Sequence, residues 1–189
     1  LYPVLMCAAA GNGDLEAIHR MLAAGAEPGG GDYDLRTPLH LAASQGQLEV
    51  TMLLVEHGAD LHAKDRWGGT PLLDAVRHGH EDVAAWLVGK GAFLPSDELV
   101  SELCLYASQG ELVPLRTLLT FGADPNVGDY DKRTPLHLAA AEGQDEAVKV
   151  LMSFGARVDS LDRWGGTPLD DAIRHGHEEI AEQLRVLFA

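Results

Sequence analysis

The chain has 189 residues, of which 46% are hydrophobic, so it is long enough to bury an apolar core without help from a metal ion or a disulfide. Its formal net charge of −15 would repel a phosphate backbone or an anionic membrane, which excludes nucleic acid and membrane as expected partners and favours a basic protein face. There is no signal peptide and no run of about 18 apolar residues, so we expect a cytoplasmic protein; the start at Leu1 suggests a fragment of a longer one.

The first predicted helix begins near Val4 and ends at Gly13, and a second helix ends at Gly25. Glycine is favoured at a helix end because it adopts the left-handed conformation at little cost. A segment rich in turn formers follows from Gly31 to Arg36 and suits a projecting hairpin. Thr37-Pro38 then starts the next helix, since the hydroxyl can cap free amides and proline lacks the N–H that the first position leaves unpaired.

The same order of helix, glycine turn, helix and hairpin recurs along the chain. The equivalent units open at Val4, Thr37, Thr70, Ser101, Thr134 and Thr167, with spacings of 33, 33, 31, 33 and 33 residues. The segment from Gly31 to Val88 recurs 97 residues later with 35 of 58 positions identical. We therefore expect one domain over 1–189 with repeats at about 1–31, 32–64, 65–95, 96–128, 129–161 and 162–189.

The block from Thr37 to Ala43, Thr-Pro-Leu-His-Leu-Ala-Ala, and its copy from Thr134 to Ala140 resemble the ankyrin-repeat motif, whose period is near 33 residues. The resemblance covers the whole chain. It implies an all-α ankyrin-repeat solenoid of six helix-pair repeats with β-hairpin fingers between them. In ankyrin proteins the fingers and inner helices form the usual contact face. The implied function is a non-catalytic protein–protein interaction module using that concave face.

A narrower resemblance gives an alternative function. The segments 3–10 and 13–17 and the link 95–99 before Glu102-Leu103-Cys104 are similar to the C-terminal ankyrin tail of lysophospholipase / L-asparaginase type proteins. The Asp-Tyr-Asp-x-Arg-Thr and Asp-Arg-Trp-x-x-Thr-Pro pieces resemble the ankyrin tail of glutaminases. The chain would then be a regulatory or oligomerisation tail of an amidohydrolase whose catalytic domain is absent from it. Its partner would be its own upstream domain.

The fourth unit departs from the pattern. Ser101-Glu102-Leu103-Cys104 replaces Thr-Pro-Leu-His, and the link that precedes it is two residues short. We expect the finger there to be distorted or replaced by a helical extension. Whether the junction near residues 93–100 is a hinge stays open.

The candidate binding residues lie at the finger tips and at the adjoining ends of the inner helices. Tryptophan, tyrosine and arginine recur among them, and these types are enriched at binding hot spots. The alternative is that the tryptophans pack on neighbouring fingers and the arginines pair with nearby aspartates. The candidates are Tyr33, Asp34, Arg36, Arg66, Trp67, Arg77, His78, Tyr130, Asp131, Arg133, Arg163, Trp164, Arg174 and His175.

No constellation for catalysis, a metal or another cofactor can be assembled. The His-Gly-His runs at His78–His80 and His175–His177 occupy the same place in two separated repeats, so we expect them to stabilise turns by hydrogen bonds. His40 and His137 should bridge fingers and helices in the same way. Cys7 and Cys104 are equally far apart and are expected to be free buried thiols.

Overall fold

The computed structural model describes residues 2–94 and 96–188, and this part of the chain forms twelve helices and no strand. The chain divides into two compact units, unit 1 (Leu1–Leu94) and unit 2 (Pro95–Ala189). One helix pair falls in each predicted repeat. Unit 1 holds α1 (Tyr2–Asn12), α2 (Leu15–Ala23), α3 (Pro38–Ser44), α4 (Leu48–Glu56), α5 (Pro71–Arg77) and α6 (Glu81–Gly89). Unit 2 holds α7 (Ser96–Gln109), α8 (Leu112–Thr120), α9 (Pro135–Ala141), α10 (Asp145–Ser153), α11 (Pro168–His175) and α12 (Glu178–Phe188).

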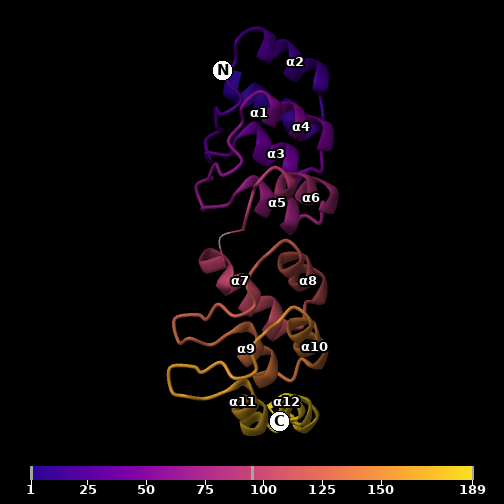
Figure 1. The fold of residues 1–189 in the computed structure, drawn as a ribbon. Helices are drawn as coiled ribbons and strands as arrows, with labels where there is room; N and C mark the ends of the chain where they lie inside the picture. The colour runs from indigo at the N-terminus through magenta and orange to yellow at the C-terminus, as the bar shows by residue number, and fades with distance from the viewer. Residues whose placement is uncertain (1, 95, 189) are drawn as a thin grey trace. The chain divides into compact units, whose positions relative to one another are not determined.

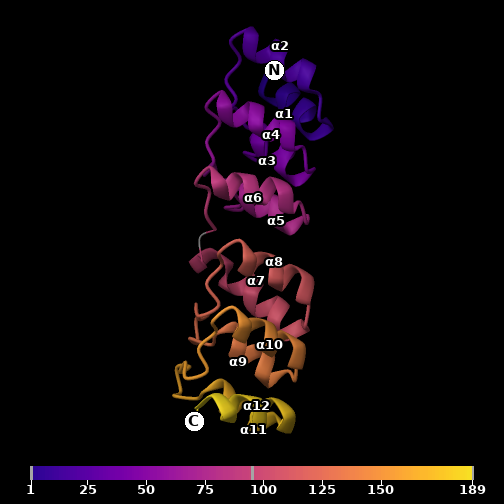
Figure 2. The same cartoon turned by 45° about the vertical axis from the view of Figure 1, so that its right-hand side comes forward.

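Within each unit the helices stack in two rows. In unit 1 the inner helices α1, α3 and α5 pack on one another, and the outer helices α2, α4 and α6 form the second row (Figure 1). Unit 2 repeats the arrangement, with α7, α9 and α11 as inner helices and α8, α10 and α12 as outer helices. Figure 2 shows the same pairing after a turn of 45°. The loops that precede α3, α5, α9 and α11 project on the side of the inner helices, and we call them fingers.

Shared burial between successive helix pairs holds each unit together. In unit 1, Met6, Ile18, Leu39 and Leu54 belong to one core cluster drawn from α1 to α4, and each is at most 1% exposed. Ala42 lies in the same cluster, and its small side chain lets neighbouring helices approach closely. No single helix pair could bury this set, so each repeat depends on its neighbours, as expected for a helical solenoid.

The predicted starts of four inner helices are confirmed, whereas α1 begins at Tyr2 rather than near Val4. Helices α3, α5, α9 and α11 each begin at the proline of a Thr-Pro pair, with the threonine at the N-cap. Gly46, in the turn after α3, has a left-handed φ of 69°, and a β-carbon there would lie 2.5 Å from His80 Nδ1. Glycine is therefore required at this turn both for the backbone conformation and for the close approach of the next repeat.

Side chains in the turns tie successive repeats together. The ring Nε2 of His80 bonds to the Ser44 carbonyl at 3.0 Å, and in unit 2 the Nε2 of His177 bonds to the Ala141 carbonyl at 3.0 Å. Gln144 Nε2 donates to the Ser108 carbonyl at 3.1 Å in the same way. The expected turn-stabilising hydrogen bonds are therefore present.

The other members of the His-Gly-His runs bond within their own helices. The Nδ1 atoms of His78 and His175 lie 2.8 and 2.9 Å from the carbonyls of Asp74 and Asp171. In the first repeat of each unit, the position occupied elsewhere by Gln or His carries Asp14 or Glu111, whose carboxylates accept hydrogen bonds but do not donate them.

The start of unit 2 differs from the other repeats. Helix α7 begins at Ser96, five residues before the unit start at Ser101, and has 14 residues, whereas α3, α5 and α9 have seven each. A helical extension thus occupies most of the segment where other repeats have a finger. Of the two outcomes expected from the sequence, a distorted finger or a helical extension, the second is present. Residue 95, which falls in the same link, lies outside the described residues.

Candidate functional site

Each finger is organised by one aspartate, which explains why the expected β-hairpins contain no strand in the described residues. In the last finger, Asp162 Oδ1 accepts the N–H groups of Trp164 at 2.8 Å and Gly166 at 2.7 Å, and the Asp162 N–H donates to the Gly166 carbonyl at 2.9 Å. A carboxylate thus takes the bonds that a second strand would otherwise provide. Asp32, Asp65 and Asp129 repeat the pattern in the other three fingers.

Two of these carboxylates, Asp32 and Asp162, are held in their charged form. Burial raises the pKa of Asp162, but the N–H groups of Gly166 and Trp164 outweigh burial and bring the pKa below its usual value. The pKa of Asp32 is lowered by the same balance, with Arg36 adding to the effect. None of the four finger aspartates was among the predicted site residues, although their spacing before the tip residues is regular in the sequence.

In the second finger of each unit, a buried histidine fastens the finger to the preceding inner helix, as predicted. The Nε2 atom of His40 lies 3.0 Å from the Gly69 carbonyl of the next finger, and His137 Nε2 lies 3.1 Å from the Gly166 carbonyl. In each ring Nδ1 accepts the backbone N–H of the N-cap threonine at 3.1 Å, which leaves the proton on Nε2 as a donor. Burial lowers the pKa of His137 despite the opposing effect of the Gly166 carbonyl, so the ring is neutral.

Adjacent fingers within a unit are also bonded to each other. In unit 1 the Arg66 N–H donates to the Asp34 carbonyl at 2.8 Å, and the Arg66 guanidinium lies 3.3 Å from the Asp34 carboxylate. In unit 2 the Arg163 N–H donates to the Asp131 carbonyl at 2.8 Å, and the side chains pair at 2.8 Å. The predicted pairing of these arginines with nearby aspartates is therefore confirmed.

The aromatic side chains at the finger tips remain exposed. The exposed fractions are 87% for Tyr33, 69% for Trp67, 90% for Tyr130 and 71% for Trp164, so neither tryptophan is packed away against a neighbouring finger. In unit 2 the Arg163 guanidinium lies 5.4 Å from the centre of the Tyr130 ring and 5.6 Å from that of Trp164. It joins the two rings into one cluster by cation–π contacts.

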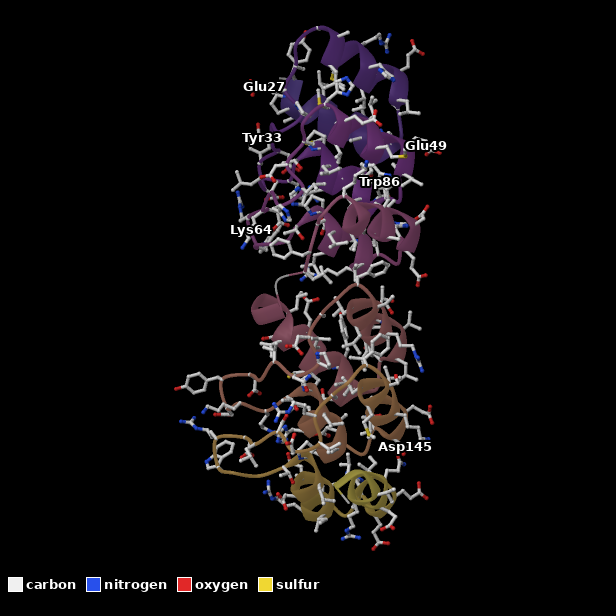
Figure 3. The ribbon with its side chains drawn as sticks, viewed as in Figure 1. Glu27, Tyr33, Glu49, Lys64, Trp86 and Asp145 are labelled. Carbon is white, nitrogen blue, oxygen red and sulfur yellow. The ribbon has the colours of Figure 1, made fainter. Side chains whose placement is uncertain are left out.

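Figure 3 separates the finger side of unit 1 from its outer-helix side. Tyr33 and Lys64 lie on the finger side, whereas Glu49 and Trp86 lie on the side of the outer helices. The exposed finger residues are therefore accessible from a direction that the outer helices do not block.

The ends of the inner helices adjoin the fingers and differ between the units. In unit 2, Asp171 is buried, and its two oxygens bond to Arg174 at 2.9 Å and Arg133 at 3.3 Å. In unit 1 the arginine equivalent to Arg133, Arg36, pairs instead with its own finger carboxylate, Asp32, at 3.0 Å.

The arrangement in unit 2 surrounds a hollow of about 280 Å³ at the foot of the last finger. It brings together four of the predicted site residues, Arg133, Trp164, Arg174 and His175, with Asp171, which the prediction omitted. Of the remaining predicted residues, Arg77 and His78 occupy the matching inner-helix end in unit 1 and are exposed.

The two cysteines are free and buried, as predicted. Burial raises the pKa of Cys7 to about 11 and that of Cys104 to about 12, so both are neutral thiols at physiological pH. Within the described residues, no group of three His, Cys, Asp or Glu side chains is placed to hold a metal ion. In the same part of the chain, every helix is too short or too polar to span a bilayer.

Comparisons with known proteins agree with this architecture. A family model described as ankyrin repeats (3 copies) matches residues 5–97 and 103–186. The chain is 56% identical to the potassium channel KOR1 of Oryza sativa subsp. japonica over 127 residues, which are 67% of this chain and 15% of the channel. It is 54% identical to the potassium channel SKOR of Arabidopsis thaliana over 127 residues, again 67% and 15% of the two chains.

A relative of another kind is the L-asparaginase of Dirofilaria immitis, 32% identical over 141 residues, which are 74% of this chain and 24% of that protein. The chain therefore spans less than a quarter of the length of each of these relatives.

Proposed function

Because the chain belongs to the ankyrin-repeat family, we propose that it is a non-catalytic protein-interaction module that holds its partner on the finger tips and inner-helix ends. The observation that carries the proposal is the exposed tyrosine, tryptophan and arginine that each unit displays on its fingers. Aromatic and arginine side chains bury much surface while keeping a polar handle, which is why they dominate binding energy at interfaces.

Rigidity of the fingers supports the same proposal. Each tip is held by an aspartate that accepts two backbone N–H groups, and in the second finger of each unit a buried histidine also ties the finger to the preceding inner helix. A surface that is already ordered loses less conformational entropy on binding than a flexible loop does. The fingers are therefore suited to hold a partner without large rearrangement.

The proposal is tested by selecting binders from a random-peptide library on the immobilised chain. The double variant Trp67→Ala/Trp164→Ala should weaken the selected peptides at least about tenfold, because a hot-spot aromatic contributes about 2 kcal/mol or more. Far-UV circular dichroism should be unchanged, since both side chains are mostly exposed. Val113→Ala on α8, an exposed apolar position away from the fingers, is the matched control and should leave affinity intact. Unaltered affinity of the double variant would refute the assignment of the finger surface.

A second candidate function is a regulatory or oligomerisation tail of an amidohydrolase. The L-asparaginase relative supports it, but the higher identity to the potassium channels favours a channel over an amidohydrolase as the kind of protein that carries this module. The coding sequence upstream of Leu1 distinguishes them, because an asparaginase-type catalytic domain there would support the tail and a channel segment would dismiss it. We propose a cytoplasmic location for the module in either case.

A further inference from the structure

The acidic surplus of the chain is not spread evenly over its surface. We define the finger face of unit 1 as residues 32–36, 44–45, 64–69 and 74–78, and that of unit 2 as 129–133, 141–142, 161–166 and 171–175. The finger face of unit 1 holds four basic and four acidic residues, and that of unit 2 holds four basic and five acidic ones. The rest of the chain therefore carries a formal charge of −14 out of −15.

In the ion pairs of the finger face, the arginine side chain is more exposed than the aspartate side chain. The side chain of Arg66 is 59% exposed and that of its partner Asp34 is 34% exposed. In unit 2, Arg174 is 61% exposed and Asp171 only 2%, and Arg163 and Asp131 are exposed to 46% and 37%. On the outer helices α2 and α12 the order is reversed, because Glu16 and Glu182 are more exposed than their partners Arg20 and Arg185. On α10, Lys149 is more exposed than Asp145.

The acids of the finger face are held inside it by bonds already described. The four finger aspartates accept backbone N–H groups, and none of the acids in the unit 1 face is fully exposed. The exposed charges of that face are Lys64, Arg66 and Arg77, all of them basic. The unit 2 face exposes Lys132, Arg163 and Arg174 together with one acid, Glu142.

A partner that docks on the fingers responds to these nearby charges rather than to the net charge, because salt screens exposed charges beyond about 8–10 Å. Arginine also binds carboxylates in a planar bidentate geometry, and the neighbouring aromatic rings favour apolar side chains. From this we infer that the finger face binds an acidic peptide segment that also carries an aromatic or apolar side chain. The inference rests on the proposed function. It assigns an acidic partner, whereas the net charge of the chain favoured a basic one.

The hollow in unit 2 shows how such a segment would be received. Its buried carboxylate, Asp171, is already bonded to Arg133 and Arg174. An incoming carboxylate therefore meets the exposed guanidinium of Arg174, the partly exposed guanidinium of Arg133 and the wall formed by Trp164. Glu142 at the rim opposes an acid, and the equivalent position in unit 1 is Gln45. Removing the charge of Glu142 should therefore tighten binding at unit 2.

The library selection described above also tests this inference, through the composition of the selected peptides. We expect finger-dependent peptides to be enriched in Asp and Glu beside Phe, Tyr, Trp or Leu, with affinity that falls as salt rises. Arg66→Gln/Arg163→Gln should weaken them about fivefold, the size expected for exposed charge pairs, and Glu142→Gln should tighten them about twofold. Arg116→Gln on α8, which removes an exposed positive charge from an outer helix, is the control and should change little.

The outcomes separate the inference from the function on which it rests. Peptides that lose binding in Trp67→Ala/Trp164→Ala but are basic or uncharged would overturn the acidic partner and leave the proposed function standing. Equal weakening by Arg116→Gln and by the finger arginine variant would also overturn the inference, since charge anywhere on the chain would then suffice. Peptides indifferent to both tryptophans, or no enriched peptide at all, would count against the proposed function itself.

Discussion

Replacing Asp162 with alanine tests whether a single carboxylate builds a finger. The variant loses two hydrogen bonds from backbone N–H groups to a charged acceptor, at 2.8 and 2.7 Å. Such bonds contribute about 1.5–3 kcal/mol each. Two such bonds together would contribute about 3–6 kcal/mol. Because the freed N–H groups in a surface loop can bond to water instead, we take the lower end of that sum and expect a loss of about 3 kcal/mol in the free energy of unfolding.

The assay is urea denaturation followed by far-UV circular dichroism, combined with amide hydrogen exchange at Trp164 and Gly166. Both amides should lose protection in Asp162→Ala even under native conditions, and peptide binding at unit 2 should weaken with them. Asp159→Ala removes an exposed carboxylate that pairs with Arg157 at 3.2 Å and is the matched control, expected to change the free energy of unfolding little. If the free energy of unfolding of Asp162→Ala is no lower than that of Asp159→Ala, the role given to the finger aspartates is wrong.

Three further predictions concern buried groups. The pKa of His137 is lowered in the folded chain, so the stabilisation by its neutral ring is complete above the ordinary pKa near 6.5 and declines as the pH falls toward the folded pKa. The urea midpoint should therefore be lower at pH 5 than at pH 7. His137→Ala should reduce that difference. Thr51→Val should raise the free energy of unfolding by about 1 kcal/mol in urea melts because its buried hydroxyl has no partner, whereas Thr117→Val should lower it, since that hydroxyl donates to the Val113 carbonyl at 2.8 Å. Cys7 and Cys104 should react with a thiol reagent at pH 8 only after unfolding, and rapid labelling of the native chain would contradict their burial.

The helix layout could be read from the sequence because each boundary has a local cause. Thr37-Pro38 caps and starts a helix whatever surrounds it, and Gly46 ends one by adopting a left-handed φ of 69°. The bridging roles of His40 and His137 were also predictable, since the resemblance places them where a finger meets a helix. These predictions depend on a few neighbouring residues and not on which distant side chains form ion pairs.

The partner of an arginine could not be predicted in the same way. Arg36 and Arg133 stand in nearly the same local sequence, yet Arg36 pairs with Asp32 and Arg133 pairs with Asp171. Each has a finger carboxylate and an inner-helix carboxylate in its unit, and the local sequence does not decide between them. The greater exposure of the arginines in these ion pairs could not be predicted from the net charge, because a net charge counts exposed and half-buried groups equally.

The turn side chains that reach back to the preceding repeat give each unit a direction. Gln144 and His177 donate hydrogen bonds to the carbonyls of Ser108 and Ala141. The Asp14 carboxylate instead accepts the Ala17 N–H of its own helix at 2.9 Å. A repeat with Asp or Glu at this turn position is therefore suited to the start of a unit. A repeat with Gln or His there needs a preceding repeat whose carbonyl accepts the hydrogen bond. An engineer who reshuffled the repeats within a unit would lose these hydrogen bonds wherever Asp or Glu replaced the Gln or His that reaches back, or a Gln or His opened the unit.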